Sequence, residues 1–193
     1  MPNSQYNALL RIDIQNDFMA NSRVAVPNAW QIIDNVNILS KSPFFQLVID
    51  IRDKHSVSNE SFAKWGPHCI AGSPGYNPPE NLYLDDDIPV FDKGIDDKID
   101  TLSGFENKDL AIYLQKNGIK SVYLAGLALD YCVYKTACDS VGLGFETFII
   151  IDACKAFNEN FAQGPEFKAS IKKLNIKLVS TFDVLKNTAG AVK

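Results

Sequence analysis

Cys132 is the side chain in this sequence whose surroundings most favour covalent chemistry. An apolar, strand-like run over Ser121–Leu127 leads into a short elbow, and Cys132 then opens a stretch of helical spacing that extends to Val141. Backbone N–H groups and the helix dipole at such a position favour a thiolate, and the same N–H groups can stabilise a developing oxyanion. The segment could therefore supply both parts of an acyl-transfer site, although a buried structural cysteine is an equal alternative from position alone.

Three candidate metal ligands lie between Asp50 and Cys69, the stretch that holds both histidines of the chain. Asp53 and His55 alternate, so an extended backbone directs both side chains the same way, and His68 can return to them after the loop. One carboxylate and two imidazoles suit Zn²⁺, Mn²⁺ or Fe²⁺. An ordinary polar loop, or a histidine that acts as the base for the thiol, is the alternative.

Asp13 is the candidate base for the thiol if both histidines bind a metal ion. It ends an apolar run, where an unpaired charge would be costly, and its alternative role is to cap a helix or turn. Lys93 could provide the opposite charge, or it could be an ordinary solvated lysine. An Asp–Lys–Cys cluster can share a proton, and its titration then belongs to the group. Three aromatic side chains flank these groups and could wall a flat ring: Phe18, Trp65 and Tyr131.

The elements that must position these groups alternate along the chain. Short apolar runs predict buried parallel strands, and helical spacing predicts helices between them. Alternating strands and helices with right-handed crossovers give a doubly wound, Rossmann-like α/β fold, with a mostly parallel six-stranded sheet and helices on both faces. The predicted strands are Asn7–Ile12, Gln46–Ile51, Val90–Phe91, Ser121–Leu127, Thr147–Ile151 and Lys177–Ser180, and the predicted helices are Asn28–Leu39, Lys108–Lys116, Cys132–Val141 and a segment from Pro165 to just before Asn175.

Ligands of such sheets bind beyond the carboxyl ends of the strands. Asp13, Asp53 and Lys93 each end or directly follow a predicted strand, as does the segment Ala128–Cys132. We therefore expect one crevice to collect the thiol, the candidate base and the candidate metal ligands. Residues 54–89 show neither strand nor helix periodicity, which indicates a functional loop region beside that crevice.

The composition is that of a soluble globular protein with one domain, residues 1–193, of which 46% are hydrophobic and 22% charged. A net charge of −4 does not favour binding to nucleic acid, which is itself negatively charged. No apolar run approaches the roughly 20 residues that span a bilayer. The N-terminal segment lacks the features of a signal peptide. We therefore expect a cytoplasmic protein whose four cysteines, with no CxxC pair, are reduced.

Four sequence segments resemble, in order, those of nicotinamidases in the isochorismatase-like cysteine hydrolase superfamily: RIDIQNDF, DKH…WGPHC, FDKG…DTLSGF and GLALDYCV. The resemblance covers roughly residues 7–185 and implies an isochorismatase-like hydrolase fold. It further implies a metal-assisted amidohydrolase that converts nicotinamide to nicotinate and ammonia through a thioester on Cys132. Another small amide as substrate is one alternative, and a catalytically silent binding domain is a second.

The resemblance also implies a catalytic triad of Cys132, Asp13 and Lys93. In it, Asp13 would take the thiol proton, while Lys93 would keep Asp13 ionised and favour the thiolate. The oxyanion would bind the backbone N–H groups of Ala128 and Cys132, and the peptide bond between Leu127 and Ala128 would be cis. The aromatic walls would be Phe18 and Trp65.

One divalent metal ion, Zn²⁺ first and Mn²⁺ or Fe²⁺ next, would be held by Asp53, His55 and His68. The family commonly has a third histidine where this chain has Asn59, so either Asn59 or its neighbour Glu60 could offer an oxygen ligand. An amide oxygen is a poorer ligand than imidazole for such metals.

Two further departures from the family pattern affect the pocket and the elbow. Leu102 stands where tyrosine is common, which removes a polar edge from a pocket that would also include Tyr131, and Leu129 replaces a usual threonine. The expected partner is the small molecule nicotinamide, with no nucleic acid and no membrane. The oligomeric state is open, and a homo-oligomer is compatible with the sequence.

Overall fold

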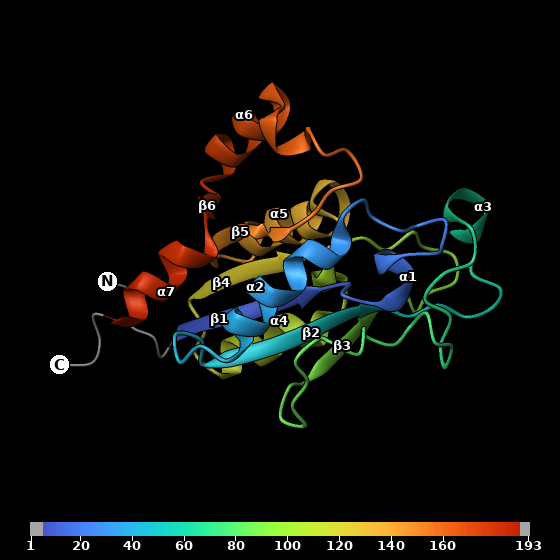
Figure 1. The fold of residues 1–193 in the computed structure, drawn as a ribbon, viewed down its shortest axis with the longest axis horizontal. Coiled ribbons are helices and arrows are strands. Elements are labelled where there is room, and N and C mark those ends of the chain that lie inside the picture. Colours follow the sequence, from blue (N-terminus) through green and yellow to red (C-terminus); the bar gives the residue numbers. More distant parts are fainter. Residues whose placement is uncertain (1–5, 190–193) are drawn as a thin grey trace.

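A computed structural model describes residues 6–189, which form a parallel sheet flanked by helices (Figure 1). All five neighbouring strand pairs of the sheet are parallel, in the order β3-β2-β1-β4-β5-β6. The predicted six-stranded α/β sheet is therefore confirmed, while the single domain over residues 1–193 stays a prediction. The strands are β1 (Asn7–Ile12), β2 (Leu47–Asp53), β3 (Val90–Lys93), β4 (Ser121–Gly126), β5 (Glu146–Cys154) and β6 (Lys177–Val179).

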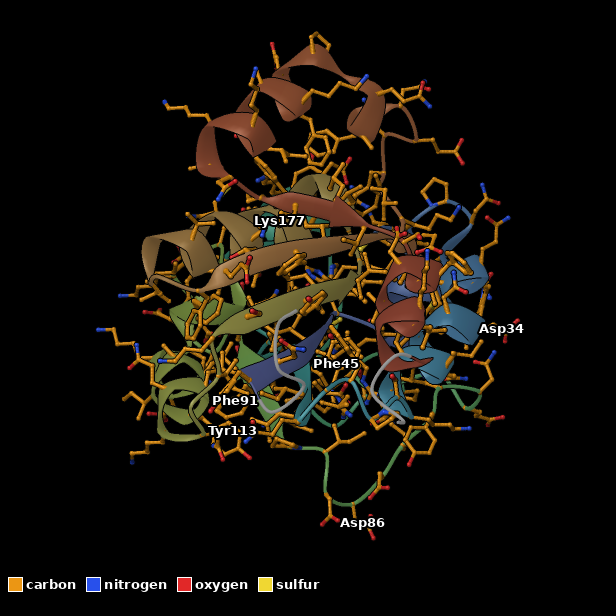
Figure 2. All side chains as sticks on the ribbon, turned by 90° about the vertical axis from the view of Figure 1, so that its left-hand side faces the viewer. Asp34, Phe45, Asp86, Phe91, Tyr113 and Lys177 are labelled. Atoms are coloured by element: carbon orange, nitrogen blue, oxygen red, sulfur yellow. The ribbon has the colours of Figure 1, made fainter. Side chains whose placement is uncertain are left out.

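Helices cover both faces of this sheet, as the alternating pattern predicts. One apolar core includes Leu39 and Val184 from helices on one face, and a second core includes Leu114 and Ala137 from helices on the other. Figure 2 shows Phe45 in the interior and Asp86 at the outer end of the loop before β3. The described residues include no helix long and apolar enough to span a membrane. The α-helices are α1 (Asn16–Met19), α2 (Ile33–Ser40), α3 (Phe62–Trp65), α4 (Lys108–Lys116), α5 (Tyr134–Gly142), α6 (Pro165–Leu174) and α7 (Thr181–Ala189), and the short 3-10 turns are η2 (Ala29–Ile32), η3 (Gly104–Glu106) and η5 (Phe161–Gln163).

One helix prediction needs correction, and the terminal helix was missed. The helix expected to begin at Cys132 begins instead at Tyr134, because a π-helical turn, η4 (Leu129–Val133), carries the cysteine just before α5. The terminal helix α7 was not predicted, although Ser180 and Asp183 form a reciprocal cap at its start, with the Asp183 carboxylate accepting from the Ser180 N–H at 2.9 Å. A serine followed three residues later by an acidic residue is a known start signal for helices.

The strand order reverses between β1 and β4, the position where doubly wound sheets bind their ligands. Ile12 pairs with Gly126 at the carboxyl ends of these two strands. A Cβ atom on Gly126 would collide with the carbonyl oxygen of Ile12, and its φ of +127° also favours glycine. Glycine thus allows the two strands to stay close up to the point where Asp13 and the elbow begin.

Candidate active site

Asp13 lies directly after β1 and is fully buried. Its backbone has a left-handed φ of 51°, and its N–H donates to the carbonyl of Ile51 at 2.9 Å. A non-glycine residue in this conformation is strained and persists only where its surroundings enforce it. The strand end therefore turns the carboxylate into the crevice at the switch point.

Lys93, the last residue of β3, is 2% exposed and stands between the two buried carboxylates. Its Nζ lies 3.0 Å from Asp13 Oδ2, forms an ion pair with Asp53 Oδ1, and lies 3.6 Å from Cys132 Sγ. The alternative of a solvated surface lysine is therefore wrong. One ammonium group links the candidate base, the thiol and the first candidate metal ligand.

The two carboxylates that share Lys93 differ in their pKa values. Burial raises the pKa of Asp13 to about 7, because desolvation outweighs the attraction of Lys93. Burial also opposes ionisation of Asp53, yet Lys93 and His55 outweigh it and lower the pKa of Asp53 to about 2. Asp53 is thus the permanent anion of the pair, and Asp13 is the group that can exchange a proton near neutrality.

The expectation that the helix start favours a thiolate at Cys132 is wrong in the free protein. Desolvation, followed by the nearby Asp13 charge, raises the Cys132 pKa well above its ordinary value, and Lys93 only partly offsets them. Lys93 does lower the pKa of Asp13, as expected, but desolvation outweighs it, so Asp13 is only partly ionised near neutral pH. Cys132 is therefore a thiol at rest, and its activation requires removal of the proton by a neighbouring base.

The elbow that carries Cys132 is held by backbone hydrogen bonds on both sides. The N–H groups of Tyr131 and Val133 both donate to the carbonyl of Ala128, at 3.0 and 3.1 Å, which closes the π-helical turn. Leu129 N–H donates to the carbonyl of Lys155 at 2.7 Å. The peptide bond between Leu127 and Ala128 is cis, as the resemblance implied. The thiol is therefore placed by the backbone at the end of β4.

Asp53, His55 and His68 lie together, all buried, with ligand atoms within 4.8 Å of one another. Asp53 Oδ2 lies 3.6 Å from His55 Nε2 and 3.8 Å from His68 Nε2, while Oδ1 faces Lys93. These three residues are the set predicted from the sequence. The described residues therefore offer a divalent metal ion one carboxylate and two imidazoles, which leaves coordination positions for water or substrate.

The hydrogen bonds of both histidines suit a metal ion. His55 Nδ1 is 3.1 Å from the carbonyl of Gly94, and His68 Nδ1 is 2.8 Å from the carbonyl of Gly66, so each Nδ1–H donates to a carbonyl and each Nε2 faces the Asp53 carboxylate. His55 Nε2 is buried without a hydrogen-bond partner. Burial lowers the pKa of His68, which favours the neutral, ligating form. The residues present therefore fit the metal.

Neither Asn59 nor Glu60 offers the free oxygen ligand that the sequence suggested. Glu60 is exposed and lies outside the cluster, so it offers no ligand. Asn59 is buried, but its Oδ1 accepts from the N–H of Ser61 at 2.9 Å and its Nδ2 donates to the carbonyl of Gly94 at 3.4 Å. Asn59 therefore supports the carbonyl that orients His55, and its oxygen is already engaged.

A pocket opens beside these groups, lined by Cys132, the three candidate ligands and a rim of largely apolar side chains. All four side chains predicted to form the pocket are among its lining residues. Phe18 meets His68 edge to face with ring centroids 5.9 Å apart, and Trp65 meets Tyr131 in the same way at 5.2 Å. The sequence interpretation missed four further lining residues, Val24, Asp100, Thr101 and Phe157, because none carried a periodic or motif signal.

Gln15 is a further contributor that sequence reasoning missed. Its side-chain Nε2 donates to the carbonyl of Asp53 at 2.8 Å, and its Oε1 accepts from the N–H of Asp53 at 2.8 Å. The amide thereby extends the pairing of β1 with β2 by one position and holds the backbone of the first candidate ligand. Its place in the segment RIDIQNDF, two residues after Asp13, was the available signal.

This fold is that of a known family, and the chain belongs to it: the isochorismatase domain matches residues 7–178. Among its relatives are enzymes named nicotinamidase. That of Acinetobacter baylyi is 32% identical over 179 residues, which cover 79% of this chain and 83% of the relative. The nicotinamidase of Escherichia coli is 30% identical over 178 residues, which cover 78% of this chain and 84% of the relative.

Solved structures agree with the sequence relatives. A pyrazinamidase of Pyrococcus horikoshii in complex with zinc has a TM-score of 0.83 and 32% identity, covering 90% of this chain and 98% of the other. A protein from L. infantum in complex with nicotinate has a TM-score of 0.86 and 27% identity, covering 93% of this chain and 94% of the other. The isochorismatase-like fold predicted from the sequence is therefore confirmed.

Proposed function

We propose that this protein hydrolyses nicotinamide to nicotinate and ammonia through a thioester on Cys132. The observation that carries the proposal is one buried cluster in which Lys93 Nζ lies 3.0 Å from Asp13 and 3.6 Å from the Cys132 sulfur, beside three candidate metal ligands. The relatives named nicotinamidase and the nicotinate complex support the choice of substrate.

Acylation begins with proton transfer from the Cys132 thiol to Asp13, whose pKa of about 7 suits a general base at neutral pH. The sulfur attacks the amide carbon, and the backbone N–H groups of Ala128 and Cys132 stabilise the oxyanion that forms. Asp13 then gives its proton to the departing nitrogen, the C–N bond breaks, and ammonia leaves a thioester behind.

Deacylation reuses the same groups in reverse. Asp13 takes a proton from water, the hydroxide attacks the thioester carbon, and the C–S bond breaks to release nicotinate. The proton on Asp13 returns to the Cys132 sulfur. Lys93 remains charged throughout and stabilises whichever of Asp13 or Cys132 is the anion at each step.

Asp53, His55 and His68 would hold the metal ion, with zinc as first candidate because a similar pyrazinamidase structure contains zinc. When bound, the ion would act as a Lewis acid toward the ring nitrogen, directly or through water. Phe18 and Trp65 would flank the flat ring, and Leu102 and Tyr131 would complete the apolar wall. These contacts orient the amide toward the sulfur.

The decisive experiment measures ammonia release from nicotinamide by Cys132→Ala and by Cys138→Ala as a matched control. Cys138 is a partly buried thiol on α5 that does not line the pocket. We expect Cys132→Ala to lose turnover with its fold intact, and Cys138→Ala to keep it. Near-normal release by Cys132→Ala would refute the mechanism. Wild-type hydrolysis of aliphatic amides in preference to nicotinamide would refute the substrate assignment, and hydrolysis of no amide would favour a silent binding domain.

A further inference from the structure

The indole of Trp65 is held at its edge by a carboxylate from a distant part of the chain. Trp65, at the end of α3, directs Nε1–H toward both oxygens of Asp100, at 3.0 and 3.2 Å. Asp100 lies in the segment between β3 and η3, so the hydrogen bond joins the end of α3 to a loop 35 residues further along the chain. Both residues line the pocket.

Lys64 completes a three-residue cluster with this pair. Its Nζ lies 2.9 Å from Asp100 Oδ2 and 4.2 Å from the centre of the Trp65 ring. The ammonium group therefore balances the Asp100 charge and also covers one face of the indole. Two independent contacts thus favour a single orientation of a large side chain that is only partly buried.

The indole also contacts a row of aromatic rings that includes Tyr131 of the elbow. Trp65 packs perpendicular to Tyr131 with centroids 5.2 Å apart, and Tyr131 packs against Phe157 at 5.6 Å. Asp130, next to Tyr131, accepts from the backbone N–H of Phe157 at 3.0 Å. The contacts of Trp65 with Asp100 and with Tyr131 therefore both restrict its orientation. Asp100 provides the polar contact of the two.

We propose that Asp100 is a positioning residue that holds Trp65 as a ready-made wall for a flat aromatic amide, an inference that rests on the proposed function. The Asp100 side chain is exposed and accepts a hydrogen bond from the Trp65 indole. Asp100 would therefore act on the substrate ring through Trp65. Without Asp100, substrate binding must immobilise the indole, which weakens affinity by roughly three- to tenfold. The chemical step at Cys132 is unaffected, since its groups are undisturbed.

The test compares KM and kcat for nicotinamide in Asp100→Ala, Asp100→Asn and Lys64→Met, with Asp87→Ala as control for loss of an exposed carboxylate. We expect Asp100→Ala to raise KM roughly fivefold with kcat within about twofold. Asparagine keeps an oxygen that accepts from the indole N–H, so Asp100→Asn should restore KM to within about twofold of the wild type. Lys64→Met should give a smaller rise than Asp100→Ala, and Asp87→Ala no change.

A spectroscopic readout separates this proposal from the proposed function. In a Trp30→Phe background, Trp65 is the one remaining tryptophan, and acrylamide quenching of its fluorescence should increase in Asp100→Ala and recover in Asp100→Asn. Unchanged quenching and unchanged KM in Asp100→Ala would overturn the proposal, as would parallel loss of kcat and thermal stability in both Asp100 variants. A wild-type protein that hydrolyses no nicotinamide would reject the proposed function, and the quenching result would still decide whether Asp100 positions Trp65.

Discussion

At the scale of single residues, the site depends on how burial divides the charges around Lys93. Two carboxylates face one ammonium, and desolvation raises the pKa of Asp13 to about 7 while the neighbouring positive charges lower that of Asp53 to about 2. Asp53 can thus remain an anionic ligand while Asp13 exchanges protons. In the proposed function, this division would let a chain with two histidines use both for a metal ion and still have a base for its thiol.

The pKa of Asp13 predicts the acid limb of the activity profile. Asp13 must be ionised to accept the thiol proton, and its pKa in the folded protein lies above the ordinary 3.8, at about 7. Activity should therefore be full above neutrality and fall roughly tenfold per pH unit below it. The measurement is kcat/KM for nicotinamide from pH 5 to 8 at constant metal concentration. A profile flat down to pH 5 would exclude Asp13 as a base with a raised pKa.

At the scale of elements, the turn after β3 positions the candidate metal site through backbone atoms. Gly94 has a φ of +76°, and its carbonyl meets both His55 Nδ1 and Asn59 Nδ2. A Cβ atom at this position would lie 2.5 Å from His55 Cε1. The glycine therefore allows the strand end to approach the imidazole closely enough to orient it.

Gly94→Ala should weaken zinc binding by about 10- to 100-fold, because it displaces the imidazole and the carbonyl that orients it. Gly118→Ala is the matched control, since Gly118 has a similar φ of +71° and open space around the missing Cβ. Competition with a chromogenic chelator measures both affinities. Equal zinc affinity of the two variants would show that the close contact between Gly94 and His55 does not control the site.

At the scale of the whole molecule, the reversal of strand order between β1 and β4 gathers the site from distant parts of the sequence. Asp13, Asp53 and Lys93 end or follow neighbouring strands, and the elbow with Cys132 follows β4. A metal ion held by Asp53, His55 and His68 would bind only the folded chain, so it should stabilise the whole fold by mass action.

Removal of metal should therefore lower both activity and thermal stability. We expect chelation to abolish most ammonia release from nicotinamide and to lower Tm by several degrees, with recovery on adding Zn²⁺, and to a lesser degree Mn²⁺ or Fe²⁺. His68→Ala is the control, because its Tm should respond little to chelator. Unchanged activity of protein shown to be free of metal would refute the proposed role.

The sequence by itself determined the strand–helix alternation and therefore the sheet edge at which the reactive groups meet. Periodicity predicts all six strands, and the strand-end rule selects Asp13, Asp53, Lys93 and the elbow without knowledge of any tertiary contact. Helix α7 could have been added from the cap formed by Ser180 and Asp183. These features are local, since residue type and spacing carry them directly.

The tertiary structure decided the remaining features, because they depend on burial and on side chains that meet across loops. Burial raises the pKa of both groups, so Cys132 is a thiol at rest and Asp13 has a pKa of about 7. The helix start alone predicts a thiolate at Cys132. Packing engaged the Asn59 oxygen, left Glu60 in solvent and placed Asp100 against Trp65, 35 residues away. Desolvation and long-range contacts have no periodic signature in a sequence, so only the folded chain could assign them.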